Sequence, residues 1–202
     1  MPPSFLPYAA DGMRIGLLGG SFDPPHAGHV HISKLALTRL GLHRVWWLVS
    51  PGNPLKSRAP APLQVRMDAC RSLIKHPKIL PTDLEANLGT RYTADTLAHL
   101  QRRYGGVTFV WLMGADNLAG FHNWEKWDGI MRSLPIAVLA RPGEQISAGL
   151  SPAARRFARY RLPARRAAAL ATRPAPCWSL LTGPMLDISS TRLRNSGHWP
   201  QG

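Results

Sequence analysis

Two histidines close behind a pair of glycines are the residues of this chain best suited to chemistry. His26 and His29 follow the run Gly19–Asp23, which reads G-G-S-F-D. Glycines let backbone N–H groups approach an anion closely, and histidine side chains can donate hydrogen bonds to phosphate oxygens. This combination predicts a loop that binds phosphate.

The residues on either side predict the elements that position this loop. An apolar run at about 13–18 predicts a buried strand, and apolar residues at helical spacing from Gly28 to about Leu40 predict a helix. A helix N-terminus offers unpaired N–H groups and the positive end of a dipole, which suits phosphate. Two histidines beside glycines are also common in solvated turns, but the order strand, loop, helix favours the phosphate role.

Further apolar runs alternate with helical segments along the chain. Strands are expected at about 44–49, 79–83, 107–113, 136–140 and 178–182, and helices at 63–74 and from residue 93. This alternation predicts an α/β fold with a Rossmann-like open sheet, mainly parallel, and helices on both faces. We expect a single domain over residues 1–202, with a loose lead-in at 1–12 and a basic insertion at 143–177, rich in Ala, Arg and Pro, whose structure the sequence does not define.

The loop carries H-x-G-H rather than either common phosphate-loop pattern. It resembles the signature of the nucleotidyltransferase superfamily with the H-x-G-H motif, and later segments make the chain similar to the bacterial nicotinate-nucleotide adenylyltransferase family. These segments read G-G-S-F-D-P-P-H-A-G-H, N-P-x-K, Y-T-x-x-T-L, G-x-D-x-L and I-S-S-T-x-x-R. The resemblance spans nearly the whole chain except residues 143–177 and both tails.

The resemblance implies transfer of an adenylyl group from ATP to nicotinate mononucleotide, giving deamido-NAD and pyrophosphate in NAD biosynthesis. The catalytic residues it implies are His26, His29, Lys56 and Arg194. The residues implied to bind ATP are Gly19, Gly20, Ser21, Phe22, Gly28, Gly114, Asp116, Ser190 and Thr191. Those implied to bind the mononucleotide are Asp23, Asn53, Tyr92, Thr93, Trp124 and Arg141. Mg²⁺ is the expected cofactor, bridging phosphate oxygens with few or no protein ligands.

Elementary chemistry supports several of these assignments. A carboxylate just past a strand end, such as Asp116, commonly accepts hydrogen bonds from ribose hydroxyls, and the flat face of Trp124 suits a cationic pyridine ring. Thr93 is either a simple N-cap or part of a helix N-terminus that binds a carboxylate. The family usually has N-P-x-H-K where this chain has N-P-L-K. One phosphate-facing histidine of the family is therefore absent.

The composition narrows the class of protein. A net charge of +14 suits an enzyme of anionic substrates and also a nucleic-acid binder. Residues 151–174 hold seven arginines and no acidic residue. No apolar run approaches the ~20 residues that span a membrane, the start does not resemble a signal peptide, and Cys70 and Cys177 are not spaced as metal ligands. We expect a cytoplasmic protein with ATP and the mononucleotide as partners and no membrane or nucleic acid, and a homo-oligomer is left open.

Three alternatives stay open at this level. Nicotinamide mononucleotide or phosphopantetheine would be another acceptor on the same fold, although Tyr92, Thr93 and Trp124 favour a pyridine ring. The arginine-rich stretch fits an RNA-binding protein, but no RNA-binding signature accompanies it. A nucleotide sensor with inactive chemistry is disfavoured by the intact His26 and His29.

Overall fold

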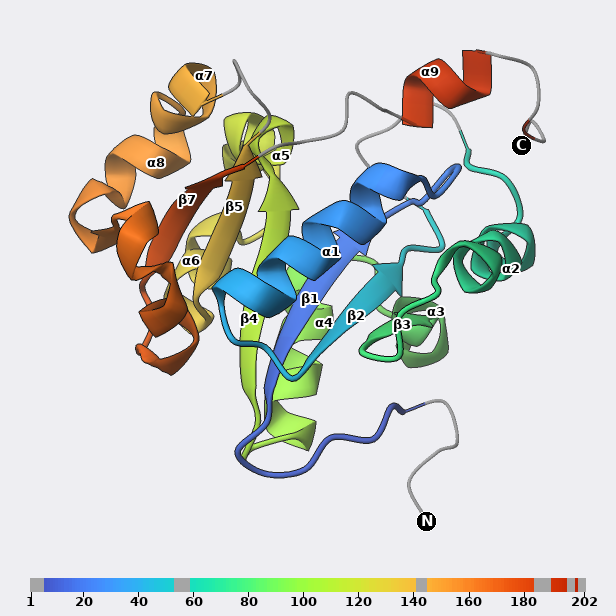
Figure 1. Cartoon of the computed structure of the whole chain (residues 1–202), viewed down its shortest axis with the longest axis horizontal. Helices are drawn as coiled ribbons and strands as arrows, with labels where there is room; N and C mark the ends of the chain where they lie inside the picture. Colours follow the sequence, from blue (N-terminus) through green and yellow to red (C-terminus); the bar gives the residue numbers. More distant parts are fainter. Residues whose placement is uncertain (1–5, 53–58, 141–144, 184–189, 196–198, 200–202) are drawn as a thin grey trace.

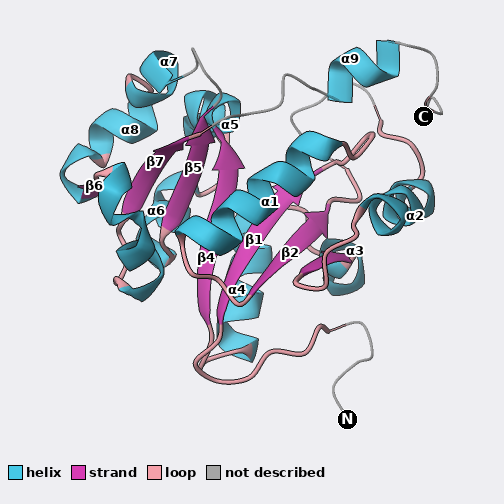
Figure 2. Ribbon diagram, in the orientation of Figure 1, coloured by secondary structure: helices cyan, strands magenta, loops and turns pink. Residues whose placement is uncertain are grey.

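The centre of the protein is one parallel sheet. A computed structural model describes residues 6–52, 59–140, 145–183, 190–195 and 199. Its seven strands lie in the order β3-β2-β1-β4-β5-β7-β6, and every strand pair is parallel (Figures 1 and 2). The strands are β1 (Arg14–Gly20), β2 (Arg44–Val49), β3 (Ile79–Thr82), β4 (Thr108–Gly114), β5 (Ile136–Ala140), β6 (Arg161–Leu162) and β7 (Trp178–Thr182).

Helices connect these strands. The α-helices are α1 (Ala27–Arg39), α2 (Leu63–Leu73), α3 (Leu84–Leu88), α4 (Thr93–Arg103), α5 (Ala115–Gly120), α6 (Trp127–Ser133), α7 (Gln145–Gly149), α8 (Pro152–Arg156) and α9 (Ser190–Asn195). Short 3-10 helices are η1 (Phe121–Asn123), η2 (Ala158–Tyr160) and η3 (Ala164–Thr172). No helix within these described ranges has both the length and the apolar character needed to cross a bilayer.

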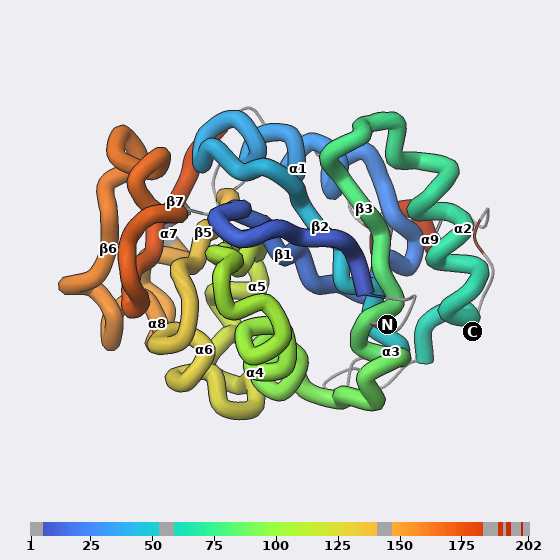
Figure 3. Tube along the Cα trace, turned by 90° about the horizontal axis from the view of Figure 1, so that it is seen from below, coloured from blue at the N-terminus to red at the C-terminus, as the bar shows by residue number. Residues whose placement is uncertain are grey.

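Strand side chains alternate between the two faces of the sheet, and each face has its own apolar core. Ile15 and Leu17 of β1 belong to the core beneath α4, α5, α6 and α8. Leu18 belongs to the core beneath α1, α2 and η3. Figure 3 shows α1 on one side of the strands and α4 and α6 on the other. The predicted α/β Rossmann-like sheet with helices on both faces is confirmed.

All parallel strands end at the same edge of the sheet, which is the upper edge in Figure 1. Gly20 of β1 pairs with Val49 of β2, and Leu18 pairs with Leu112, two residues before the end of β4. The chain leaves this edge into α1, into α5 and towards α9. In open parallel sheets ligands bind at this edge, and most of the predicted site residues follow a strand there.

Some local predictions differ from the structure. The strand extends through Gly19 and Gly20, so both glycines belong to β1 rather than to the loop. Thr93 is not the N-cap of α4, because its own backbone is already helical, and the extended residue before the helix is Tyr92.

The structure describes most of the N-terminal lead-in and of the basic insertion. Residues 6–12 are held to the loop before β4, since Gly12 N–H donates to Gly106 O and Tyr104 O–H donates to Pro7 O, both at 2.7 Å. Residues 145–177 form α7, α8, η2, β6 and η3, which bury Phe157 and Leu170 against the β7 side of the sheet.

Both cysteines are buried free thiols. Burial raises the pKa of the Cys70 thiol to about 12, and burial also raises the pKa of Cys177. A thiol that stays protonated at neutral pH is a poor nucleophile and a poor metal ligand. Cys70 is therefore a core residue of α2.

Candidate active site

His26 and His29 form a capping box at the start of α1. His26 is the extended N-cap residue, and its Nδ1 accepts a hydrogen bond from Gly28 N–H at 3.1 Å. His29 Nδ1 in turn accepts from His26 N–H at 3.2 Å. Because each Nδ1 is an acceptor, the proton of each neutral imidazole lies on Nε2. The fold thus selects the tautomer in which Nε2–H can donate to a phosphate oxygen.

Aromatic side chains pack around the ring of His29. The Phe22 ring stacks on Trp47 of β2 with centroids 4.8 Å apart, and the His29 ring lies 4.8 Å from Phe22. Trp47 Nε1 donates to Ser33 Oγ at 2.8 Å, and Ser33 Oγ donates to His29 O at 2.8 Å. Both the ring and the backbone of His29 are therefore fixed by groups that do not depend on substrate.

Gly19 is required by packing at the end of β1. A Cβ atom there would lie 2.4 Å from Trp111 Cη2, and Trp111 is fully buried in β4. Phe22 has a positive φ of 46°, which is uncommon for an aromatic residue. The backbone that leads into the histidines is thus shaped by close contacts with β2 and β4.

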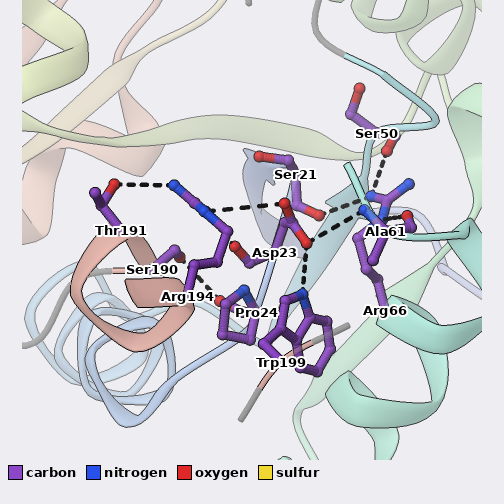
Figure 4. Close-up of polar contacts among 10 residues, drawn as sticks. All are labelled: Ser21, Asp23, Pro24, Ser50, Ala61, Arg66, Ser190, Thr191, Arg194 and Trp199. Atoms are coloured by element: carbon purple, nitrogen blue, oxygen red, sulfur yellow. Dashed lines mark hydrogen bonds and ion pairs between the residues drawn. The ribbon is translucent and has the colours of Figure 1, made fainter. Parts of the chain in front are cut away.

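The C-terminal helix α9 lies on the loop between β1 and α1 (Figure 4). Ser190 Oγ donates to Pro24 O at 2.9 Å. Arg194 donates to Asp23 O, and its guanidinium lies 3.8 Å from the Asp23 carboxylate. Arg194 Nη2 also donates to Thr191 Oγ1 at 3.0 Å. The structure therefore brings α9, which carries three residues implied by the family resemblance, onto the predicted phosphate loop, although Arg194 and Asp23 are 171 residues apart in sequence.

The Asp23 carboxylate is buried and held by the chain itself. Its Oδ1 accepts from Ala61 N–H at 3.3 Å and from Trp199 Nε1 at 2.6 Å (Figure 4). Together with Arg194, these groups connect the loop to α2 and to a residue near the C-terminus. The described contacts of the Asp23 carboxylate are with residues of the chain itself, and its contact with the mononucleotide stays a prediction.

Gly114 and Asp116 lie where β4 ends and α5 begins. Gly114 is the extended N-cap residue of α5, and Asp116 is exposed in the first turn. A Cβ atom at Gly114 would lie 2.3 Å from Asp116 Oδ1. Glycine at this position therefore leaves room for the carboxylate at the carboxyl edge of the sheet.

The N-terminus of α4 faces the segment that follows η1. Asp95, in the first turn of α4, forms an ion pair with Lys126 at 3.1 Å. Tyr92 is the N-cap residue of the same helix, and Thr93 is its first residue. The two predicted parts of the mononucleotide pocket, one in α4 and one before α6, are thus brought to one region of the fold.

Trp124 is held edge-on by two buried rings. Its centroid lies 5.2 Å from Phe121 and 6.2 Å from Trp111, both at steep interplanar angles. Trp124 itself is only partly buried. Edge-on contacts fix the plane of the indole, which is what a stacking surface for a flat ligand requires.

Comparison with known proteins identifies the family. The cytidylyltransferase-like family profile matches residues 17–196. A protein of Cereibacter sphaeroides named probable nicotinate-nucleotide adenylyltransferase is 62% identical over 187 residues, which cover 93% of this chain and 99% of that protein. The chain belongs to the nicotinate-nucleotide adenylyltransferase family. A family member from Ruegeria pomeroyi with the same name is 57% identical over 194 residues, covering 96% of this chain and 91% of that protein.

Solved structures agree on the fold. The structure of a nicotinic acid mononucleotide adenylyltransferase from Plasmodium falciparum complexed with NaAD has a TM-score of 0.67 and covers 91% of this chain and 83% of that chain. The same enzyme complexed with APC has a TM-score of 0.64. Sequence identities of 19% and 18% mean that these two likenesses concern the fold alone.

Three predicted site residues lie outside the described residues, namely Asn53, Lys56 and Arg141. Their roles stay predictions that rest on the resemblance to the family. The described residues that directly follow β1 and β4 lie at the carboxyl edge of the sheet.

Sequence reasoning missed four residues that shape the site: Ser33, Trp47, Arg66 and Glu85. Arg66 occupies the buried face of α2 next to Met67 and Cys70. A charged residue within an apolar helical stripe is the signal that could have revealed it. Glu85 is 8% exposed, and burial raises its pKa to about 7, with a hydrogen bond from Ser50 opposing the shift.

Proposed function

We propose that this chain transfers the adenylyl group of ATP to nicotinate mononucleotide, which gives deamido-NAD and pyrophosphate. The observation that carries the proposal is the capping box of His26 and His29, with α9 attached to the same loop, in a member of this family. We further propose that the whole chain forms one nucleotidyltransferase domain and that it acts in the cytoplasm.

The reaction needs no nucleophile from the protein. An oxygen of the mononucleotide 5′-phosphate attacks the α-phosphorus of ATP in line, the new P–O–P bond forms, and the bond to the β-phosphate oxygen breaks. Pyrophosphate leaves with the electron pair. Catalysis of this kind rests on positioning and on neutralising charge in the transition state.

We assign each phosphate group of ATP to protein side chains, following the order in which these side chains lie along the site. His29 Nε2–H donates to the α-phosphate, and His26 Nε2–H donates towards the β/γ end. Ser190, Thr191 and Arg194 of α9, with Lys56, hold the triphosphate and the leaving pyrophosphate. This assignment is supported by the tautomer that the capping box selects, because it makes both rings donors without a change in protonation.

We propose that Mg²⁺ accompanies ATP and is held by phosphate oxygens and water. When bound, it offsets part of the charge on the phosphates. Within the described residues, no group of three or more His, Cys, Asp or Glu side chains is placed to hold a metal ion. The donors that this part of the chain offers are suited to phosphate oxygens, and no step proposed here depends on a protein ligand to the metal.

The mononucleotide is proposed to lie between α4 and Trp124. Its pyridine ring stacks on the indole, and its carboxylate accepts hydrogen bonds from backbone N–H groups near Tyr92 and Thr93. Asp116 binds the ribose of the adenosine. The ion pair between Asp95 and Lys126 supports this arrangement, since it joins the two walls of the pocket.

The test compares two acceptors. Pyrophosphate release is measured with ATP and Mg²⁺, using nicotinate mononucleotide or nicotinamide mononucleotide at equal concentration. Strong preference for the acid is expected. Equal rates would keep adenylyl transfer but contradict the carboxylate pocket, and no release with either acceptor would contradict the function.

A pair of histidine variants tests the chemistry. His29→Ala should lower kcat by ~10²-fold or more, by analogy with losing one donor to a transition-state oxygen. His43→Ala is the matched control, because His43 is exposed and lies just before β2, at the opposite edge of the sheet. An unchanged kcat in His29→Ala would refute the assignment of that ring.

A further inference from the structure

Arg66 of α2 joins the two loops that follow β1 and β2. We propose that Arg66 is a positioning residue for adenylyl transfer: its guanidinium sets the relative position of the loop that holds ATP and the loop that leads to the mononucleotide. The inference rests on the proposed function. We call residues 21–26 the phosphate loop and residues 50–52, the described part of the segment after β2, the second loop.

The guanidinium donates four hydrogen bonds, all of them to backbone carbonyls. Nη1 donates to Ser21 O at 2.7 Å and to Ser50 O at 2.6 Å, and Nη2 donates to Pro51 O at 3.3 Å. Nε donates to Ala61 O at 2.7 Å. The side chain is 1% exposed, and Figure 4 shows it beside Ser21, Ser50 and Ala61.

These contacts begin where the strand ladder stops. Ser50 N–H donates to Gly20 O at 3.0 Å, and this bond continues the β1–β2 ladder by one residue. One residue further, Nη1 bridges Ser21 O and Ser50 O, at the point where the two chains diverge. Arg66 therefore replaces the missing ladder bonds and fixes the separation of the two loops.

Both loops lead to residues that the family resemblance assigns to the substrates. The phosphate loop leads into the capping box of His26 and His29. The second loop leads directly to Asn53 and Lys56, which the family resemblance assigns to the mononucleotide and the phosphates. A bridge between the loops therefore controls how the attacking phosphate meets the α-phosphate, rather than how tightly either substrate binds alone.

Only arginine fits this position. The four acceptors surround a planar fork with several fixed N–H donors, whereas lysine is a point charge with a single nitrogen. Burial lowers the pKa of Arg66, and attraction to the Asp23 carboxylate opposes that effect. Asp23 also binds Arg194 of α9, so Arg66 and α9 hold the phosphate loop from opposite sides.

The expected effect follows from the demands of in-line attack. A displacement of about 1 Å between reacting groups can lower the rate by about 10²-fold. Arg66→Met should therefore lower kcat by ~10²-fold, whereas the Kd for ATP should stay within about threefold of the wild type. Arg66→Lys should lower kcat by about 10-fold or more, because its single nitrogen cannot serve both loops at once.

The experiment combines kinetics with binding and stability. Pyrophosphate release gives kcat and KM for wild type, Arg66→Lys, Arg66→Met and Arg66→Ala, calorimetry gives the Kd for ATP, and thermal unfolding gives Tm. Methylguanidinium added to Arg66→Ala should restore part of kcat. Met67→Ala is the matched control: Met67 is the next residue of α2, is 3% exposed, and packs in the core, so its loss should lower Tm and leave kcat unchanged.

Each result of these experiments supports or overturns the positioning role of Arg66. Folded Arg66 variants with the kcat of the wild type would overturn the proposal, and so would a loss of ATP affinity as large as the loss of kcat. An equal loss of kcat in Met67→Ala, or failure of both Arg66→Met and Arg66→Lys to fold, would assign Arg66 to the stability of the fold instead. If the wild type releases no pyrophosphate, the proposed function itself is wrong, and this result can be told apart from a failure of the Arg66 proposal.

Discussion

Replacing Glu85 by glutamine should stabilise the protein above neutral pH and flatten the pH dependence of its stability. Glu85 lies in α3, just past the end of β3, and is 8% exposed. Desolvation by burial raises the pKa of its carboxyl group from 4.5 to about 7, and the hydrogen bond with Ser50 lowers it in part. The folded protein therefore favours the neutral acid.

The hydrogen bonds around Ser50 agree with a protonated Glu85. Ser50 Oγ donates to Gly52 O, and a hydroxyl has one proton to donate. A protonated Glu85 can donate to Ser50 Oγ while Ser50 donates to Gly52 O. An ionised Glu85 competes with Gly52 O for the single hydroxyl proton, at the start of the second loop.

The direction and the size of the effect of pH on stability follow from proton linkage, because Glu85 binds protons differently in the folded and unfolded states. Between pH 4.5 and about 7 the folded state binds more protons at Glu85 than the unfolded state does, so stability falls as the pH rises. The contribution is fully present below about pH 4.5 and is lost above about pH 7. The pKa shift from 4.5 to about 7 is about 2.5 units, which corresponds to roughly 3 kcal/mol at ~1.4 kcal/mol per unit.

Urea unfolding, followed by tryptophan fluorescence at several pH values, measures the unfolding free energy and so checks the predicted pH dependence. Glutamine is neutral at every pH, so the gap in unfolding free energy between Glu85→Gln and wild type should widen by roughly 2.5 kcal/mol between about pH 5 and pH 8. Glu125→Gln, at an exposed position, should leave the curve of the wild type unchanged. Parallel curves for wild type and Glu85→Gln would refute the reasoning.

Three further changes test the packing of the site. Gly19→Ala places a Cβ atom 2.4 Å from Trp111 Cη2, so urea unfolding should show a loss of about 1–3 kcal/mol from overpacking; an unchanged midpoint would mean that the ring can move. Ser33→Ala removes the partner of the Trp47 indole N–H, so stability should fall by about 1–3 kcal/mol, and no loss would mean that water replaces the hydroxyl. Trp124→Ala should raise the KM for nicotinate mononucleotide by about 5–10-fold through lost stacking and leave the KM for ATP unchanged; an equal rise for both substrates would contradict a pocket specific to the pyridine ring.

The sequence by itself determined the family, six strands of the sheet and its longest helices. The bounds of β2, β5 and β7 agree with the expected apolar runs, because strands buried on both faces are continuously apolar and stop at turn residues. The histidine loop and α1 could also be predicted, since paired histidines beside glycines and a helical stripe are local patterns. Family membership followed from five such short segments in order.

Only the tertiary structure decided how distant segments meet. A strand order of β3-β2-β1-β4-β5-β7-β6 brings the ends of β1 and β2 together and returns the chain after β7 to the phosphate loop. No local pattern encodes that Arg194 binds Asp23, that Gly19 faces Trp111, or that Glu85 is desolvated beside Ser50. Arg66 shows the reason most clearly. Its four carbonyl acceptors come from three separate segments of the chain, and they meet because β1 and β2 end at the same edge of the sheet.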